Sequence, residues 1–172
     1  MRPLAPGPSR SHYMAVEFSA AARQEFEEYL RRYPTKRAAI MPTLWLAQRE
    51  FRYLSRDVLA YIASLIDESP AFVASVASFY TMYYKKPMGQ HHIQVCTNLS
   101  CALMGSDRIV DACARRLGVG LGETTADGKF SLDEVECLAS CGTAPMMQVN
   151  DDYWENLTPE STLELIERLA RG

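Results

Sequence analysis

Four of the five cysteines in this 172-residue chain form two pairs with the overall spacing C-x4-C-x35-C-x3-C. The first pair is Cys96 and Cys101, and the second is Cys137 and Cys141. A net-acidic chain without a secretion signal is expected in a reducing compartment, where paired cysteines more often bind a metal than form disulfides. The four-cysteine pattern therefore constrains the fold most strongly, because a metal site requires these thiols to meet at one place.

The spacing inside each pair restricts the local structure. On one helix, side chains five residues apart point about 140° away from each other, so we expect Cys96 and Cys101 to lie in a loop. Cys137 and Cys141 can converge from a turn or from one helical turn. Four thiolates suit an iron–sulfur cluster or a structural zinc, although zinc usually takes tighter C-x2-C pairs. The spacing favours a [2Fe–2S] cluster and leaves zinc, redox-active thiols and structural cysteines as alternatives.

Charge divides the chain into two parts. Residues 1–90 carry 12 basic and 8 acidic side chains, whereas residues 91–172 carry 6 basic and 13 acidic ones, so the net charge changes from +4 to −7. The acidic half argues against a nucleic-acid partner. No apolar run is long enough to span a bilayer, and we expect no direct membrane insertion. The boundary between the two regions is expected near residues 85–89.

The first part of the chain predicts a helical bundle. A proline-rich start without the apolar core of a signal peptide predicts a flexible tail over residues 1–16. Apolar side chains at helical spacing fill residues 17–88, which we interpret as an assembly region. Four helices are expected, beginning at Ser19, near Lys36, at Ser55 and at Ser69. The aromatic residues Phe79, Tyr80, Tyr83 and Tyr84 are interpreted as core or interface.

Residues 89–172 predict a thioredoxin-like order of strands and helices, with the cysteines in loops at strand ends. The expected elements are a strand over 91–95, a helix over 107–117 capped by Ser106, strands over 130–136, 146–150 and 152–155, and a last helix from Thr158. His91 and His92 cannot form a metal-binding pair, because neighbouring side chains on a strand point to opposite faces. Cys113 is expected to be a buried, unreactive thiol.

Several motifs resemble one known family. They are Cys96-x4-Cys101, Gly122-Glu123-Thr124-Thr125-x-Asp127-Gly128-x-Phe130, Val135-Glu136-Cys137-Leu138-x-x-Cys141, Ala144-Pro145-x-x-Gln148-Val149-Asn150, Ser78-Phe79-Tyr80-Thr81-Met82 and Leu46-Ala47-Gln48. Together they resemble the NuoE-type subunit of respiratory complex I, over nearly everything after the first dozen residues. The chain departs from that family at Phe51-Arg52-Tyr53-Leu54, which lacks a glycine often seen there, and at Ala139, where glycine is common.

The resemblance implies an α+β fold, in which an N-terminal helical bundle is followed by a thioredoxin-like domain over residues 89–172. It implies one [2Fe–2S] cluster held by Cys96, Cys101, Cys137 and Cys141. The implied partner is the flavin- and NADH-binding NuoF-type subunit, with the rest of the peripheral arm. FMN and NADH are expected on that partner, so the chain itself is an electron carrier of NADH:quinone oxidoreductase, without a catalytic residue or a substrate site. The implied location is cytoplasmic, associated with the inner membrane through the complex, with the mitochondrial matrix as the alternative.

Some points stay open at this level. The equivalent subunit of a soluble NAD-dependent hydrogenase or formate dehydrogenase would carry the same motifs, and a zinc-stapled interaction module is a third interpretation. The spacing does not decide which cysteines share an iron. The Ala144–Pro145 bond can be cis or an ordinary trans bond. Backbone N–H groups next to the cysteines are expected to donate hydrogen bonds to the sulfurs. The residues that can supply them are Thr97, Asn98, Leu99, Ser100, Leu138, Ala139, Gly142 and Thr143.

Overall fold

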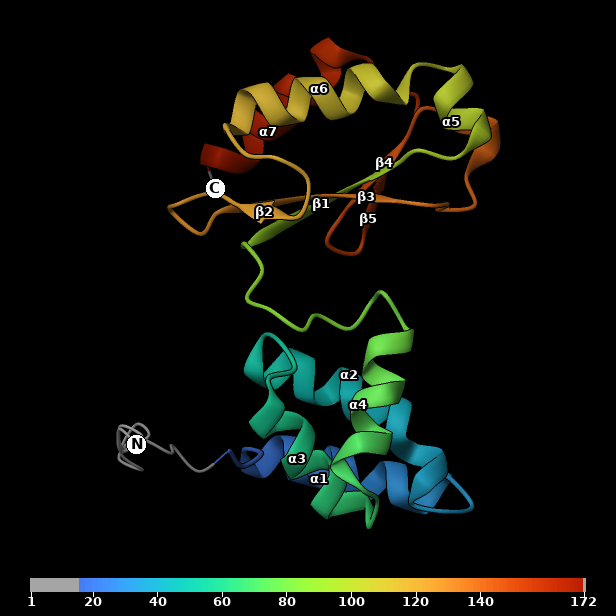
Figure 1. The fold of residues 1–172 in the computed structure, drawn as a ribbon, viewed down its shortest axis with the longest axis vertical. Helices are drawn as coiled ribbons and strands as arrows, with labels where there is room; N and C mark the ends of the chain where they lie inside the picture. Colours follow the sequence, from blue (N-terminus) through green and yellow to red (C-terminus); the bar gives the residue numbers. More distant parts are fainter. Residues whose placement is uncertain (1–15, 172) are drawn as a thin grey trace, which may run out of the picture. The chain divides into compact units, whose positions relative to one another are not determined.

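The computed structural model describes residues 16–171, which divide into two compact units with the division between Pro87 and Met88 (Figure 1). The flexible tail expected over residues 1–16 lies outside the described residues, except for residue 16. The described part of the first unit contains helices only, whereas the second unit combines a sheet with three further α-helices. The α+β class predicted from the sequence is confirmed.

The described part of the first unit is helical (Figure 1). Its elements are α1 (Ala20–Arg32), a 3-10 turn (Arg37–Ala39), α2 (Ile40–Phe51), α3 (Arg56–Ile66) and α4 (Pro70–Phe79). The side chains of Ser19, Ser55 and Ser69 each accept a hydrogen bond from the backbone N–H three residues further along. The helix starts predicted at these serines are confirmed, because each serine satisfies a backbone donor that the helix cannot pair.

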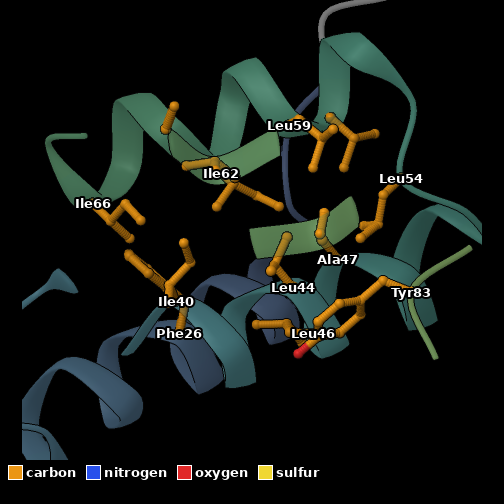
Figure 2. Close-up of a cluster of buried hydrophobic side chains, with 14 of the residues drawn as sticks. Phe26, Ile40, Leu44, Leu46, Ala47, Leu54, Leu59, Ile62, Ile66 and Tyr83 are labelled. Atoms are coloured by element: carbon orange, nitrogen blue, oxygen red, sulfur yellow. The ribbon is translucent and has the colours of Figure 1, made fainter. Parts of the chain in front are cut away.

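The apolar faces of these helices meet in one core. Figure 2 shows side chains from α1, α2 and α3 converging there, together with Tyr83 from the segment that follows α4. Tyr83 is fully buried and its hydroxyl donates to the carbonyl of Met41 at 3.0 Å, whereas Phe79 is 79% exposed.

Among the described helices, none alone is long and apolar enough to cross a membrane. The helices α3 and α4, which are bent by 117° relative to each other, pass that test of length and composition only when they are joined.

The second unit is a five-stranded mixed sheet with helices packed on it. Its elements are β1 (His91–Cys96), α5 (Leu99–Leu103), α6 (Ser106–Leu117), β2 (Glu123–Thr124), β3 (Phe130–Val135), a 3-10 turn (Cys141–Thr143), β4 (Met147–Val149), β5 (Asp152–Trp154) and α7 (Pro159–Arg171). The strand order is β2-β3-β1-β4-β5, with β1 parallel to β3 and the other neighbours antiparallel. Figure 1 shows α6 and α7 side by side over one face of the sheet.

The central strand β1 connects this core to the cysteines. Ile93 and Val95 are fully buried and belong to the same apolar cluster as Ile109 of α6 and Ile166 of α7. The period of two along a strand directs these two side chains to one face. Cys113 lies in the same cluster with no exposed surface, and burial raises the pKa of its thiol to about 12. The prediction of a buried thiol is therefore confirmed.

Two local expectations were wrong, and one strand was missed. Cys101 lies on the short helix α5 and not in a loop, because Asn98 caps a new helix by accepting from the N–H of Leu99 at 2.7 Å. The residue before α6 is Gly105, at a φ of 90°, and Ser106 is the first helical residue. Glycine adopts such a φ readily, which allows the turn between the two helices. The strand β2 was missed because two residues are too few to show a periodic pattern.

Candidate metal centre

The topology brings the four predicted site cysteines to one edge of the sheet. The carboxyl ends of β1 and β3 meet there because these strands are parallel, with Cys96 opposite Val135. Cys96 ends β1, and Cys137 follows two residues after the end of β3. The helix α5, which carries Cys101, contacts the 3-10 turn that begins with Cys141. Residues from both sequence pairs therefore reach the same place.

The sulfur contacts cross between the two pairs. The thiols of Cys101 and Cys137 both lower the pKa of the Cys96 thiol, and Cys101 interacts electrostatically with Cys96 and with Cys141. Cys96 and Cys101 are 4% and 2% exposed and pack against Met146. Cys137 and Cys141 are exposed. The group thus has a buried half on regular elements and a half that faces solvent.

Backbone amides point at three of the four sulfurs. The donors are the N–H groups of Asn98 and Leu138 to Cys96, of Met146 to Cys101, and of Ala139 to Cys137 at 3.3 Å. Donors of this kind stabilise negative charge on sulfur, which a metal-binding thiolate carries. The site is therefore arranged to hold thiolates, although it is partly buried.

The pKa values of the two buried thiols differ in direction. Burial by itself raises the pKa of Cys96, but hydrogen bonds from Asn98, Leu138 and the neighbouring thiols outweigh burial and lower it. The pKa of Cys101 is raised, first by burial and then by its contact with Cys96. Cys96 is therefore the first of these two thiols to become a thiolate, the form that binds a metal.

The predicted amide donors are right in part. Asn98, Leu138 and Ala139 donate to sulfur as expected, whereas the N–H of Thr97 donates to the carbonyl of Val135 and that of Thr143 to the carbonyl of Ser140, both at 3.1 Å. Leu99 donates to its neighbour's side chain. These amides are engaged in other hydrogen bonds, that of Thr97 with the neighbouring strand β3 and that of Thr143 within a turn, so they are not available to the site.

Met146 is a contributor that sequence reasoning missed. It follows Pro145, and the Ala144–Pro145 bond is cis, one of the two isomers that the sequence left open. The carbonyl of Met146 accepts from the N–H of Cys96 at 3.1 Å, and the carbonyl of Pro145 accepts from Leu157 at 2.9 Å. A proline followed by an apolar residue is the signal that could have pointed to this segment, but its contact with Cys101 depends on the pairing of β4 with β1.

The donor set fits a [2Fe–2S] cluster. Within residues 16–171, no three or more His, Cys, Asp or Glu side chains are close enough to hold one metal ion. A [2Fe–2S] cluster does not require three protein ligands around one metal position, because its four thiolates are divided between two irons. His91 and His92 begin β1, at the end of the strand opposite Cys96, so they do not join the site.

Comparison with known proteins agrees with this geometry. The chain matches the family model described as thioredoxin-like [2Fe–2S] ferredoxin over residues 26–170. It is 45% identical over 146 residues to the E subunit of NADH-quinone oxidoreductase from Rickettsia bellii, covering 83% of this chain and 87% of that protein. Its identity to the protein of the same name in Mycobacterium bovis is 41% over 175 residues, covering 96% of this chain and 69% of that protein.

A solved structure shares the fold at lower sequence identity. A chain of an NAD+-reducing [NiFe]-hydrogenase in the air-oxidized state matches with a TM-score of 0.69 and 20% identity. The match covers 77% of this chain but only 23% of the hydrogenase chain. The family match and the two relatives confirm the resemblance found in the sequence: the chain belongs to the thioredoxin-like [2Fe–2S] ferredoxin family, among the E subunits of NADH-quinone oxidoreductase.

Proposed function

We propose that this chain is the [2Fe–2S] electron-transfer subunit in the NADH-oxidising module of an NADH:quinone oxidoreductase, with Cys96, Cys101, Cys137 and Cys141 as the cluster ligands. The observation that carries the proposal is that both sequence pairs meet at one edge of the sheet, where Cys96 ends β1 beside the end of β3 and α5 contacts the 3-10 turn that begins with Cys141. It occurs in a chain 41–45% identical to proteins named as E subunits of NADH-quinone oxidoreductase. When bound, a [2Fe–2S] cluster supplies reversible one-electron transfer.

The chain's own residues would hold the cluster and set its electrostatic surroundings. The amides of Asn98, Leu138 and Met146 place partial positive charge at the sulfurs, which favours an added electron. The net charge of −7 on residues 91–172 opposes that electron and lowers the reduction potential. FMN and NADH are proposed to bind a partner subunit, as the resemblance to the NuoE-type subunit implies.

The partner is proposed to be the flavin- and NADH-binding NuoF-type subunit. The relatives are named as subunits, which supports an assembly with other chains. Two apolar side chains of α5 and the residue directly after it lie near Cys101, are well exposed and would suit contact with a protein: Leu99 at 70%, Leu103 at 78% and Met104 at 63%. A partner seated there would lie beside the sulfur ligands, as electron exchange requires.

The division of labour along the chain is part of the proposal. Residues 17–88 would be the assembly region and residues 89–172 the cluster domain. The exposed ring of Phe79, at the end of α4, supports an assembly role for the helices. The proposed location is the cytoplasmic side of the inner membrane, where the chain would be held by the rest of the complex.

A second candidate is the equivalent subunit of a soluble NAD-dependent hydrogenase or formate dehydrogenase. The fold of the hydrogenase chain supports it, but at 20% identity this likeness speaks for the fold only. The relatives from NADH-quinone oxidoreductase are more than twice as similar in sequence, which favours the first candidate. Purifying the tagged chain from its own cells and identifying the bound subunits distinguishes the two, since quinone-reducing membrane subunits accompany only the first.

The cluster itself is tested on the purified chain. We expect a brown protein containing iron and sulfide, with visible absorbance that dithionite bleaches and a paramagnetic signal in the reduced state. Replacing any of Cys96, Cys101, Cys137 or Cys141 with serine should abolish or destabilise the cluster. Cys113→Ser is the matched control, because this thiol is buried between α6 and the sheet. A colourless, zinc-containing protein would support the interaction module instead, and loss of the signal only in Cys113→Ser would overturn the ligand assignment.

A further inference from the structure

We propose that Glu155 is a positioning residue that holds the segment from Cys137 to Thr143 in the shape that binds the cluster. The inference rests on the proposed function, because it takes the four cysteines as ligands. Glu155 directly follows β5, and its Oε1 accepts a hydrogen bond from Thr143 Oγ1 at 2.7 Å and a second one from Ser140 Oγ. These two hydroxyl residues stand on either side of Cys141 in the sequence.

The two halves of the site differ in how they are held. Cys96 ends a central strand and Cys101 lies on a helix, so main-chain hydrogen bonds and burial fix both. Cys137 and Cys141 are exposed and lie between β3 and β4, where the backbone is irregular apart from one 3-10 turn. The positions of these two sulfurs therefore depend on contacts from outside the segment.

The β4–β5 hairpin and the residues after it supply these contacts. The hydroxyl of Tyr153 donates to the carbonyl of Leu138 at 3.0 Å, and the N–H of Asn156 donates to the carbonyl of Thr143 at 2.8 Å. Glu155 acts between these two points, and the Ser140 and Thr143 hydroxyls also contact each other at 2.8 Å. The contacts thus span the segment from Leu138 to Thr143 and include the region of Cys141.

Glu155 is ionised under working conditions. The hydroxyl of Ser140, and then that of Thr143, lowers the pKa of its carboxyl group by hydrogen bonding to the charged form. Glu155 should therefore affect the site in two ways. Its hydrogen bonds hold the segment that carries Cys137 and Cys141, and its negative charge close to that segment opposes an added electron.

These two effects can be separated by substitution. Glu155→Gln retains an oxygen that can accept from the hydroxyls but removes the charge, whereas Glu155→Ala removes both. Thr143→Val removes one hydroxyl donor and keeps a similar side-chain volume. Glu164→Ala is the matched control, because Glu164 is an exposed carboxylate of the same unit, on α7.

The experiment uses the full chain carrying its cluster and measures the rate at which an iron chelator bleaches the visible absorbance. Glu155→Ala should lose the cluster several-fold faster than wild type, Glu155→Gln at nearly the wild-type rate, and Glu164→Ala at the wild-type rate. Thr143→Val should also accelerate the loss, but should add little in the Glu155→Ala background, because the same hydrogen bond is already gone. In a redox titration followed by paramagnetic resonance, Glu155→Gln should raise the midpoint potential.

The inference is overturned if Glu155→Ala keeps its cluster as long as wild type, or if glutamine does not restore retention. An unchanged midpoint potential in Glu155→Gln would overturn the electrostatic part. If Glu155→Ala fails to fold, Thr143→Val still tests the hydrogen bond, and a wild-type rate of loss in that variant contradicts the inference. Failure of the proposed function is distinguishable, since the wild-type chain would then assemble no [2Fe–2S] cluster.

Discussion

The Nε2 atom of His92 lies 2.7 Å from Oδ2 of Asp133 on the neighbouring strand β3. His92 is only 4% exposed, and its backbone N–H donates to Asn150 Oδ1 at 2.9 Å while its carbonyl accepts from the Asn150 N–H at 3.0 Å. A buried polar side chain requires such partners. The ring of the adjacent His91 lies near that of Phe130, tilted by 34° and with 5.3 Å between centroids. The two histidines thus have separate surroundings, as the strand alternation predicts.

The His92–Asp133 contact should contribute to stability. Asp133→Ala is expected to lower the free energy of unfolding by about 1–3 kcal/mol, because the buried imidazole loses a hydrogen-bonding partner. Urea denaturation followed by circular dichroism measures the change. Glu134→Ala is the control, since this neighbouring carboxylate on β3 is exposed. Equal losses in the two variants would contradict the assigned role of Asp133.

Arg52 occupies a backbone conformation that suits glycine. Its φ is 72°, in a region that costs a residue with a Cβ about 1–2 kcal/mol. Arg52→Gly should therefore be more stable than Arg52→Ala by about 1 kcal/mol, after the greater freedom of glycine in the unfolded chain is counted. Thermal and urea unfolding of the two variants give this difference. If alanine proves as stable as glycine, the strain at this position is not real.

Stability should decline in alkaline solution, partly through Cys113. Below the ordinary thiol pKa of 9.0, the Cys113 thiol is protonated in both the folded and the unfolded chain, so its contribution to the free energy of unfolding is fully present. As pH rises towards the folded-state pKa of about 12, the unfolded chain releases the proton first and the contribution is lost. Cys113→Val should flatten the fall in unfolding free energy over that range. Identical pH profiles for the variant and the wild type would refute this prediction.

Phe79 should matter for assembly rather than for folding. Its ring is 79% exposed and contacts Tyr80 edge-on, with 5.0 Å between centroids. Phe79→Asp should reduce co-purification of the chain with its partner subunit, because a charge replaces an apolar contact surface, while the unfolding free energy stays within about 0.5 kcal/mol. Ser75→Asp adds the same charge to an exposed position of the same helix and should have no effect on co-purification. A similar loss in both variants would point to a general charge effect.

Local features of the structure were predictable because their causes lie within a few residues. Ser19, Ser55 and Ser69 each cap a helix by accepting a hydrogen bond from the N–H three residues further along. Both partners of such a bond lie within a few residues of sequence, so the cap can be recognised without the tertiary structure. Both departures from the family pattern were also visible. The segment from Phe51 to Leu54 lacks a glycine often seen in the family, and its Arg52 has a φ of 72°; Ala139 stands where glycine is common and has a φ of 60°.

The sequence by itself determined the α+β class and most of the helix starts, and it singled out the four cysteines that the fold brings to one edge of the sheet, since these features depend on spacing, periodicity and capping chemistry. The tertiary structure decided what depends on residues far apart in the chain. Cys101 contacts Met146 only because β4 pairs with β1, and Glu155 reaches the Cys141 segment only through the β4–β5 hairpin. Contacts of this kind are set by strand pairing and burial across the whole unit, which no local pattern of residues encodes.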